Sequence, residues 1–167
     1  SVVFVMKGVM NATRQMNSTN TNTGGWAASA MRTWLNDRLF AELPRQWQSM
    51  IKTVQVMSSI GQTKADISAS EDKIFLLSQA ELGWNKTEVP YKDEVDADAE
   101  NVTFALFTDN ASRIKKAYNG EGAATGWWLR SPVASSSSNF YYVGNNGSSG
   151  NGGAGNSYGV AFGFSLI

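Results

Sequence analysis

The apolar residues in the first third of the chain recur at helical spacing. A first amphipathic helix is predicted over residues 26–40, because its apolar side chains lie three or four positions apart. Pro44 suits the first turn of a second helix, where its missing N–H costs nothing. One face of this second helix is expected to carry Trp47, Met50 and Ile51.

Other apolar segments have the length and composition of strands. Residues 2–6 and 74–77 are continuous apolar runs and predict buried strands, and residues 53–57 predict a short strand. In the final segment, residues 160–166, large apolar side chains alternate with small ones. One face of this last strand is therefore expected to be buried.

A hairpin is predicted between residues 140 and 155. Asn145-Asn146-Gly147 is a strong turn signal, because Asn and Gly tolerate positive φ. It separates a strand at 140–143 from a partner at about 148–155. Upstream of the hairpin, Trp127, Trp128 and Leu129 are expected in the core.

Two short helices are predicted in the middle of the chain. Ser78 and Glu81 match a capping box, so a short helix should follow and end near Gly83. Residues 111–118 predict one or two further turns. Their basic side chains are expected on the solvent side: Arg113, Lys115 and Lys116. Polar segments are expected to be loops: residues 11–23, 61–70 and 88–100.

Helices come early in this order and strands come late, with one strand at the N-terminus. That layout predicts an α+β domain rather than alternating βαβ units. At 167 residues, the chain has the length of one domain and can bury a sizeable core. No internal repeat or linker divides it, so a single domain over residues 1–167 is expected.

The composition excludes several classes of function. The chain contains no Cys and no His, which rules out thiolate metal sites, disulfides and Ser-His or Cys-His relays. Its net charge is zero, so electrostatic capture of nucleic acid is not expected. No apolar run reaches the length of a membrane span, and no membrane insertion is expected.

The tail of the chain, residues 131–167, carries no charged side chain. Residues 134–159 consist mainly of Gly, Ser and Asn, with tyrosines among them, and both flanks are rich in aromatic and aliphatic residues. A polar segment held between two core elements favours a displayed surface over a flexible tail. Ser, Asn, Gly and Tyr also dominate antibody-like binding loops. The tail therefore predicts a ligand-binding surface.

Five sequence blocks occur in this order along the chain: Met16-Asn17-Ser18-Thr19-Asn20-Thr21-Asn22, Gly24-Gly25-Trp26, Met31-Arg32-Thr33-Trp34-Leu35-Asn36, Glu71-Asp72-Lys73-Ile74-Phe75-Leu76-Leu77-Ser78 and Trp127-Trp128-Leu129-Arg130-Ser131-Pro132. Together these blocks resemble one known family, the C-type-lectin-like variable proteins of diversity-generating retroelements. The resemblance implies a C-type-lectin-like fold, with two early helices and a C-terminal antiparallel sheet paired with an N-terminal strand. One departure is Gly159-Val160-Ala161-Phe162, where related sequences often have Gly-Val-Arg-Pro.

In that family a reverse transcriptase copies a template and randomises its adenines, so that Asn codons scatter into a limited set of residues. Residues 133–159 of this chain use only Val, Ala, Ser, Asn, Phe, Tyr and Gly, which is the expected set. The resemblance thus implies a scaffold over residues 1–132 and a variable ligand-binding region over residues 133–160.

The resemblance also divides this region into fixed and display positions. Fixed positions are Phe140, Val143, Gly147, Ala154, Tyr158, Gly159 and Val160. Display positions, expected to bind ligand, are Ser135, Ser137, Ser138, Asn139, Tyr142, Gly144, Asn145, Gly150, Asn151, Gly152, Gly153, Gly155 and Asn156. Either Tyr141 or Tyr142 could point outward, and the family pattern favours Tyr142. The side chains expected to hold the scaffold are Trp26, Trp34, Trp127, Trp128 and Phe162.

The resulting hypothesis is a non-enzymatic, hypervariable protein that binds a protein or glycan on a host or neighbouring cell, from a virion or a cell surface. The alternative is a fixed adhesive or structural domain. A remote alternative is catalysis like that of formylglycine-generating enzymes, which share the lectin-like fold but need Cys. Asp93 and Glu94 lie in a charged segment without a catalytic pattern. No cofactor or metal is expected, and an acidic group is interpreted as a solvated loop rather than a calcium site: Asp96, Asp98 and Glu100.

Overall fold

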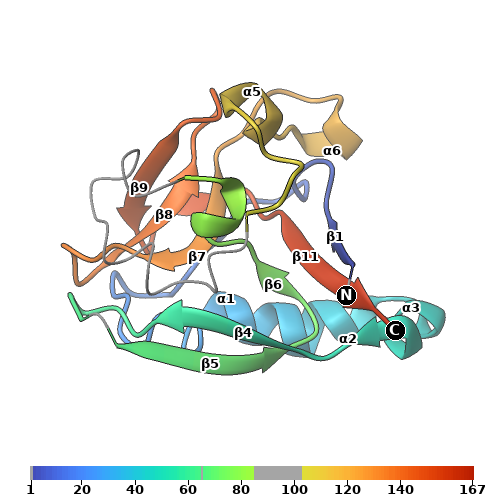
Figure 1. The fold of residues 1–167 in the computed structure, drawn as a ribbon, viewed down its shortest axis with the longest axis horizontal. Helices are drawn as coiled ribbons and strands as arrows, with labels where there is room; N and C mark the ends of the chain where they lie inside the picture. Colours follow the sequence, from blue (N-terminus) through green and yellow to red (C-terminus); the bar gives the residue numbers. More distant parts are fainter. Residues whose placement is uncertain (1, 65, 85–102) are drawn as a thin grey trace.

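A four-stranded antiparallel sheet brings the two ends of the chain together (Figure 1). We analysed a computed structural model, which describes residues 2–64, 66–84 and 103–167. β1 (Val3–Val5) pairs with β11 (Phe162–Leu166), and Phe4 lies opposite Phe164. The other edge of β11 pairs with β3 (Ile51–Lys52) and β6 (Phe75–Leu76). The predicted N-terminal strand exists, but its predicted burial is wrong: as an edge strand, it leaves Phe4 44% exposed.

One continuous helical segment runs from Ala30 to Glu42. It comprises α1 (Ala30–Thr33), a π-helical stretch (Trp34–Leu39) and α2 (Phe40–Glu42). It begins four residues later than predicted, because Ser29 caps it: the Ser29 hydroxyl accepts a hydrogen bond from the Arg32 amide at 3.1 Å. Trp26 lies in the preceding turn and is fully buried.

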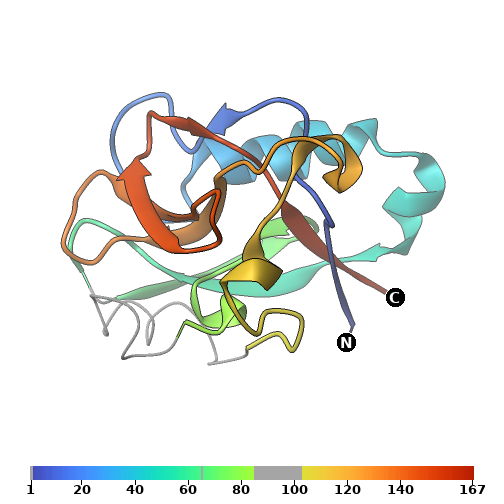
Figure 2. The same cartoon turned by 90° about the horizontal axis from the view of Figure 1, so that it is seen from above.

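The second helix, α3 (Arg45–Met50), follows Pro44 as predicted. The apolar face that starts on this helix is only partly buried: Ile51 is 4% exposed, whereas Trp47 is 44% and Met50 39% exposed. α3 lies at the opposite end of the molecule from β9 (Ser149–Gly153), beside the outer end of β11 (Figures 1 and 2). There the Trp47 ring meets Phe164 edge-on, with 5.9 Å between ring centroids. Sequence spacing identified an apolar stripe on this helix, but the sheet covers only part of it.

β4 (Val54–Ser59) and β5 (Ile67–Asp72) form a separate antiparallel pair, in which Val54 faces Asp72. The strand at 53–57 is therefore confirmed, and the loop predicted over 61–70 is wrong in its second half. Residues 67–72 contain two serines and two carboxylates, a poor strand composition. Pairing with β4 overrides this local preference.

A three-stranded antiparallel sheet consists of β7 (Trp127–Pro132), β8 (Asn139–Val143) and β9. β7 is buried along its whole length, which confirms the predicted core position of the two tryptophans. The hairpin between β8 and β9 is also confirmed. Its turn depends on Gly147, whose φ is +82° and whose added Cβ would lie 1.8 Å from the Asn110 carbonyl oxygen.

β10 (Ser157–Tyr158) pairs with β2 (Arg14–Gln15). The N-terminal segment before α1 thereby lies against the chain that leaves the three-stranded sheet (Figure 2). In the following strand, β11, the buried face carries the small residues Gly163 and Ser165. Phe162 and Phe164 are on the other face and are half-buried. A Cβ on Gly163 would approach the Phe75 ring to 3.2 Å, so the core packs directly on the backbone of β11.

The capping box at Ser78 is confirmed. The Ser78 amide donates to the Glu81 carboxylate at 2.8 Å, and the Glu81 amide donates to the Ser78 hydroxyl at 3.2 Å. A 3₁₀ turn, Ala80–Leu82, follows and ends at Gly83 with φ of +80°. Further along are α5 (Asn110–Arg113) and α6 (Ala117–Gly120).

The predicted exposure of two basic side chains near α5 is wrong, because Arg113 and Lys115 are each only 5% exposed. The Lys115 ammonium donates to the Met6 and Lys7 carbonyl oxygens and lies 5.2 Å from the Trp127 ring centroid. Burial lowers the pKa of Lys115 to about 8.

Raising the pH from about 7.5 to about 9 should therefore stabilise the protein by about 1 kcal/mol through Lys115. Between its folded pKa of about 8 and its ordinary value of 10.5, the unfolded chain binds more protons than the folded chain, so stability rises with pH. Urea unfolding at several pH values should show this rise in the wild type and not in Lys115→Met. Equal slopes in the two proteins would contradict the assignment.

Several sequence hypotheses concern residues outside the described ranges: Asp93, Glu94, Asp96, Asp98, Glu100 and the rest of segment 88–100. Within the described ranges, no group of three or more metal-binding side chains comes together. None of the helices in this part of the chain is long and apolar enough to cross a bilayer.

Candidate functional site

The thirteen predicted display positions lie in the three-stranded sheet and in the loops at its ends. They differ in exposure. The exposed ones are Ser135, Ser137, Asn145, Asn151 and Asn156. The half-buried ones are Ser138, Asn139, Tyr142, Gly144, Gly150, Gly153 and Gly155, and Gly152 is buried. The exposed positions are therefore the ones whose side chains are accessible from solvent.

Buried polar residues hold the loop before β8 in place. Asn22 is fully buried, and its side-chain amide donates to the Ser136 and Asn139 carbonyl oxygens at 2.7 and 3.0 Å. Its carbonyl oxygen accepts from the Gln62 amide at 2.9 Å, and the Gln62 side chain donates to the Ser137 carbonyl oxygen at 2.8 Å. These bonds use only the backbone of the loop, so the Ser137 side chain stays exposed.

The loop after β9 is held in a similar way from the N-terminal segment. The Asn17 amide donates to the Ala154 carbonyl oxygen at 3.1 Å, and the Gly155 amide donates to the Asn20 side chain at 3.3 Å. The same Asn20 oxygen would lie 2.1 Å from a Cβ on Gly153. A side chain at position 153 therefore requires Asn20 to move, whereas Asn156 extends into solvent.

An aromatic cluster supports the middle of the sheet. Tyr142 and Tyr158 are stacked with 4.2 Å between ring centroids, and Trp128 meets Tyr158 edge-on at 4.7 Å. Burial, and then the hydrogen bond with Tyr142, raise the pKa of Tyr158. A Cβ on Gly150 would lie 2.8 Å from the Tyr142 ring, and one on Gly152 would lie 3.1 Å from the Tyr158 ring. The two glycines make room for the tyrosine pair.

Tyr141 and Tyr142 occupy opposite faces of β8. Tyr141 is 1% exposed and belongs to the core, whereas Tyr142 is half-buried. The cluster around Tyr142 thus forms the boundary between core and surface.

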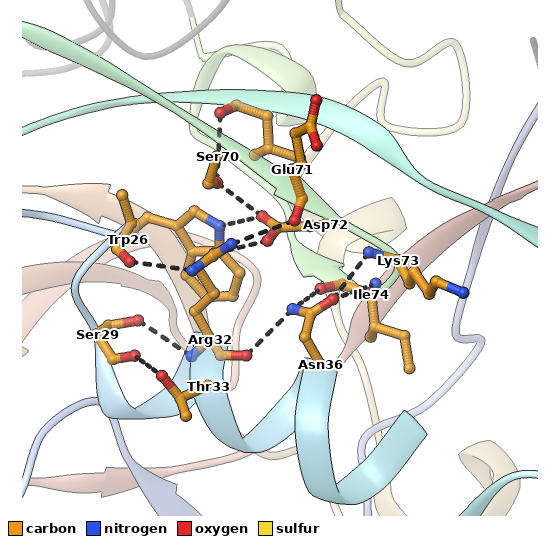
Figure 3. A network of polar contacts seen from close by, with 12 residues as sticks. Trp26, Ser29, Arg32, Thr33, Asn36, Ser70, Glu71, Asp72, Lys73 and Ile74 are labelled. Carbon is orange, nitrogen blue, oxygen red and sulfur yellow. Dashed lines mark hydrogen bonds and ion pairs between the residues drawn. The ribbon is translucent and has the colours of Figure 1, made fainter. Parts of the chain in front are cut away.

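Three of the five sequence blocks that carry the family resemblance meet in one polar network: those containing Trp26, Arg32 and Asp72 (Figure 3). Asp72 is fully buried and accepts hydrogen bonds from the Trp26 indole at 2.8 Å, the Ser70 hydroxyl at 2.8 Å and the Arg32 guanidinium at 2.6 Å. The Asn36 side chain bridges the same helix to β5 and β6: it donates to the Ile74 carbonyl oxygen and accepts from the Ile74 amide. These residues stabilise the scaffold and do not face the display positions.

A second buried ion pair joins β7 to the capping box. Arg130 is 3% exposed and binds Glu81 through two bonds, of 2.8 and 3.0 Å. Its guanidinium also donates to the Leu76 and Met57 carbonyl oxygens. The Arg130 guanidinium is thus buried and binds groups inside the protein. We infer that the arginine of the Trp-Leu-Arg-Ser-Pro block stabilises the fold.

Sequence reasoning missed the residues that hold the loops on either side of β8 and β9. Asn22 and Gln62 lie in segments predicted to be loops, and their partners are more than 70 residues away in sequence. The one available signal was the unusual density of Asn and Thr in residues 16–23.

Comparison with known proteins gives one match. No curated protein and no solved structure matches the chain. The sequence model of one protein family matches residues 1–166, nearly the whole chain. The chain therefore belongs to the family described as a domain of unknown function, DUF6273.

Proposed function

We propose that the protein is a C-type-lectin-like domain that binds ligands through a variable surface, diversified by a retroelement. The binding surface consists of the loop before β8, the β8–β9 hairpin and the loop after β9. On this proposal the residues before 133 form the fixed scaffold. The mixed α+β architecture, with β1 and β11 paired at the ends of the chain, is compatible with such a fold.

One observation carries the proposal. The backbone of residues 136–139 and 154–155 is fixed by Asn17, Asn20, Asn22 and Gln62, while side chains at neighbouring positions extend into solvent. A surface of this kind separates recognition from stability, because an exposed side chain can change without disturbing the bonds beneath it. Binding loops on rigid scaffolds commonly follow this arrangement.

The exposure of each position, and the space around its glycines, divide the display positions into two groups. Side chains at 135, 137, 145, 151 and 156 are exposed, and a change at 151 removes only the hydrogen bond that the Asn139 side chain donates to Asn151 at 2.8 Å. Side chains at Gly150 and Gly152 would meet Tyr142 and Tyr158, so changes there require the tyrosines to move or shrink. We expect natural variants with larger residues at 150 to carry a smaller residue at 142.

The chemistry of the surface favours a neutral, polar ligand. Residues 131–167 contain no charge, and the exposed groups are hydroxyls, amides and part of the Tyr142 ring. Such groups bind through directional hydrogen bonds and aromatic contact rather than through ion pairs. A neutral protein surface or a neutral glycan fits this description.

Sequencing the DNA around the gene tests the proposal most directly. We expect a reverse transcriptase gene and a near-copy of the segment that encodes residues 128–167, differing at template adenines. Finding them would identify the varied codons. Their absence, together with identical display positions in sibling genes, would refute diversification and leave a fixed adhesive domain.

Ser137→Tyr should leave the free energy of unfolding within about 0.5 kcal/mol of wild type, because the Ser137 side chain is exposed. Asn22→Ala is the matched contrast. It leaves the Ser136 carbonyl oxygen without its donor and the Gln62 amide without its acceptor, and should cost about 2 kcal/mol or more. Urea unfolding measures both. A loss of cooperative unfolding in Ser137→Tyr would overturn the division between display and scaffold.

A further inference from the structure

A cavity of about 480 Å³ lies between Trp84, the start of α5 and the turn that follows β8. None of the thirteen display positions lines it, and only Ser148 and Ser149 of its lining belong to the β8–β9 hairpin. Polar side chains dominate its wall: Thr108, Asp109, Asn110, Ser148 and Ser149. Its size is within the range of small-molecule binding sites.

Arg113 supplies the cation of this cavity. The residue lines the cavity yet is only 5% exposed, and its guanidinium lies over the Trp84 ring at 4.7 Å from the centroid. Its Nε donates to the Leu82 carbonyl oxygen at 2.9 Å, and its Nη1 donates to the Asn110 side chain at 3.0 Å. Across the described ranges, Arg113 forms no ion pair with a carboxylate.

Within the described part of the chain, this arrangement leaves the buried charge of Arg113 without a carboxylate partner. A buried arginine generally pairs with an anion, because unpaired burial of a charge is costly. Two neutral oxygens and one aromatic ring orient the Arg113 guanidinium, and no acceptor for its Nη2 group is found among the described residues. The fork of an arginine matches the two oxygens of a carboxylate.

The neighbouring groups extend the same site. The hydroxyls of Ser148 and Ser149 line the cavity, and the Ser149 hydroxyl donates to the Gln79 side chain at 3.4 Å. Gln79 is 1% exposed, and its Nε2 has no partner in the described part of the chain. The cavity therefore has hydroxyl groups, and an unsatisfied amide donor behind one of them, near its single cation.

Asp109 places one negative charge on the wall. Its carboxylate accepts from the Ser112 amide at 2.8 Å and caps α5. A ligand carboxylate on this side would be repelled, whereas one near Arg113 would be attracted. The charges of the cavity thus define where an acidic ligand group lies.

We propose that this cavity binds a small polyhydroxylated acid, with the ligand carboxylate paired to Arg113. The ligand hydroxyls bind Ser148, Ser149 and Asn110. The site does not use any of the thirteen display positions: its cation and helix residues precede residue 133, and Ser148 and Ser149 come from the β8–β9 hairpin.

NMR titration of the ¹⁵N-labelled full chain with glucuronate tests the proposal, and glucuronamide serves as the uncharged match. Glucuronate should shift the Arg113 Nε–H, Trp84 indole and Ser149 amide signals saturably, and glucuronamide should bind at least about tenfold more weakly. Equal shifts with both probes, or shifts elsewhere only, would overturn the proposal.

Two variants refine the test. Asp109→Asn keeps the helix cap, because Asn caps as well as Asp, and should tighten glucuronate binding about threefold by removing repulsion. Arg113→Gln should weaken glucuronate binding at least about tenfold. If Arg113→Gln does not fold, Asp109→Asn and the pair of probes still decide: unchanged affinity in Asp109→Asn contradicts the assigned position of the ligand carboxylate.

Discussion

Trp128→Ala should lower the free energy of unfolding by about 3–5 kcal/mol, the range for removing a large aromatic side chain from a packed core. Trp128 is fully buried, and its indole donates to the Arg14 carbonyl oxygen at 2.8 Å. It also packs edge-on against Tyr142 and Tyr158. The substitution therefore leaves a cavity, an unsatisfied carbonyl oxygen and a tyrosine pair without support.

Trp47→Ala is the matched control for this experiment. Trp47 is 44% exposed and has one edge-on contact with Phe164, so its removal should cost about 1 kcal/mol or less. Urea unfolding followed by far-UV circular dichroism measures both variants with the same probe. Similar losses for the two tryptophans would contradict the assignment of Trp128 to the core.

Elements encoded by local signals could be predicted from the sequence. The capping box at Ser78 and Glu81 and the turn at Gly147 depend on residues a few positions apart, and both exist as predicted. Continuous apolar runs likewise identified β6 and the core tryptophans of β7. In these cases local preference and tertiary environment agree.

Features that depend on distant segments could not be predicted. Arg113 and Lys115 occur in a short helical segment whose local pattern places charges outside, but carbonyl oxygens of Leu82 and Met6 bind them inside. Trp47 shows the reverse case. Its spacing places it on an apolar helix face, and only the limited extent of the sheet leaves it exposed. Burial of single side chains is decided by which elements meet.

For the candidate surface too, some features follow from the local sequence and others depend on contacts between distant segments. Its location follows from composition, because an uncharged segment of Gly, Ser and Asn lies between two core elements. The contacts that limit its variation do not follow from composition. In the folded chain, Gly150 lies against the Tyr142 ring and Gly153 lies against the Asn20 side chain. Glycines that look alike in the sequence therefore differ in whether a larger side chain fits at their position.

Asp72→Ala should cost about 3–5 kcal/mol, comparable with breaking other buried charge pairs. Asp72 is the common acceptor of Trp26, Ser70 and Arg32, and its removal leaves the buried indole N–H and the serine hydroxyl unsatisfied. Glu71→Ala is the adjacent control; its side chain is exposed and should matter by about 0.5 kcal/mol or less. Asp72→Asn keeps the size and one acceptor oxygen and should fall between the two. If Asp72→Ala and Glu71→Ala unfolded at the same urea concentration, the network that joins the Gly-Gly-Trp block to β5 would contribute no stability. The loops of the proposed binding surface would then be fixed by the contacts of Asn17, Asn20, Asn22 and Gln62 alone.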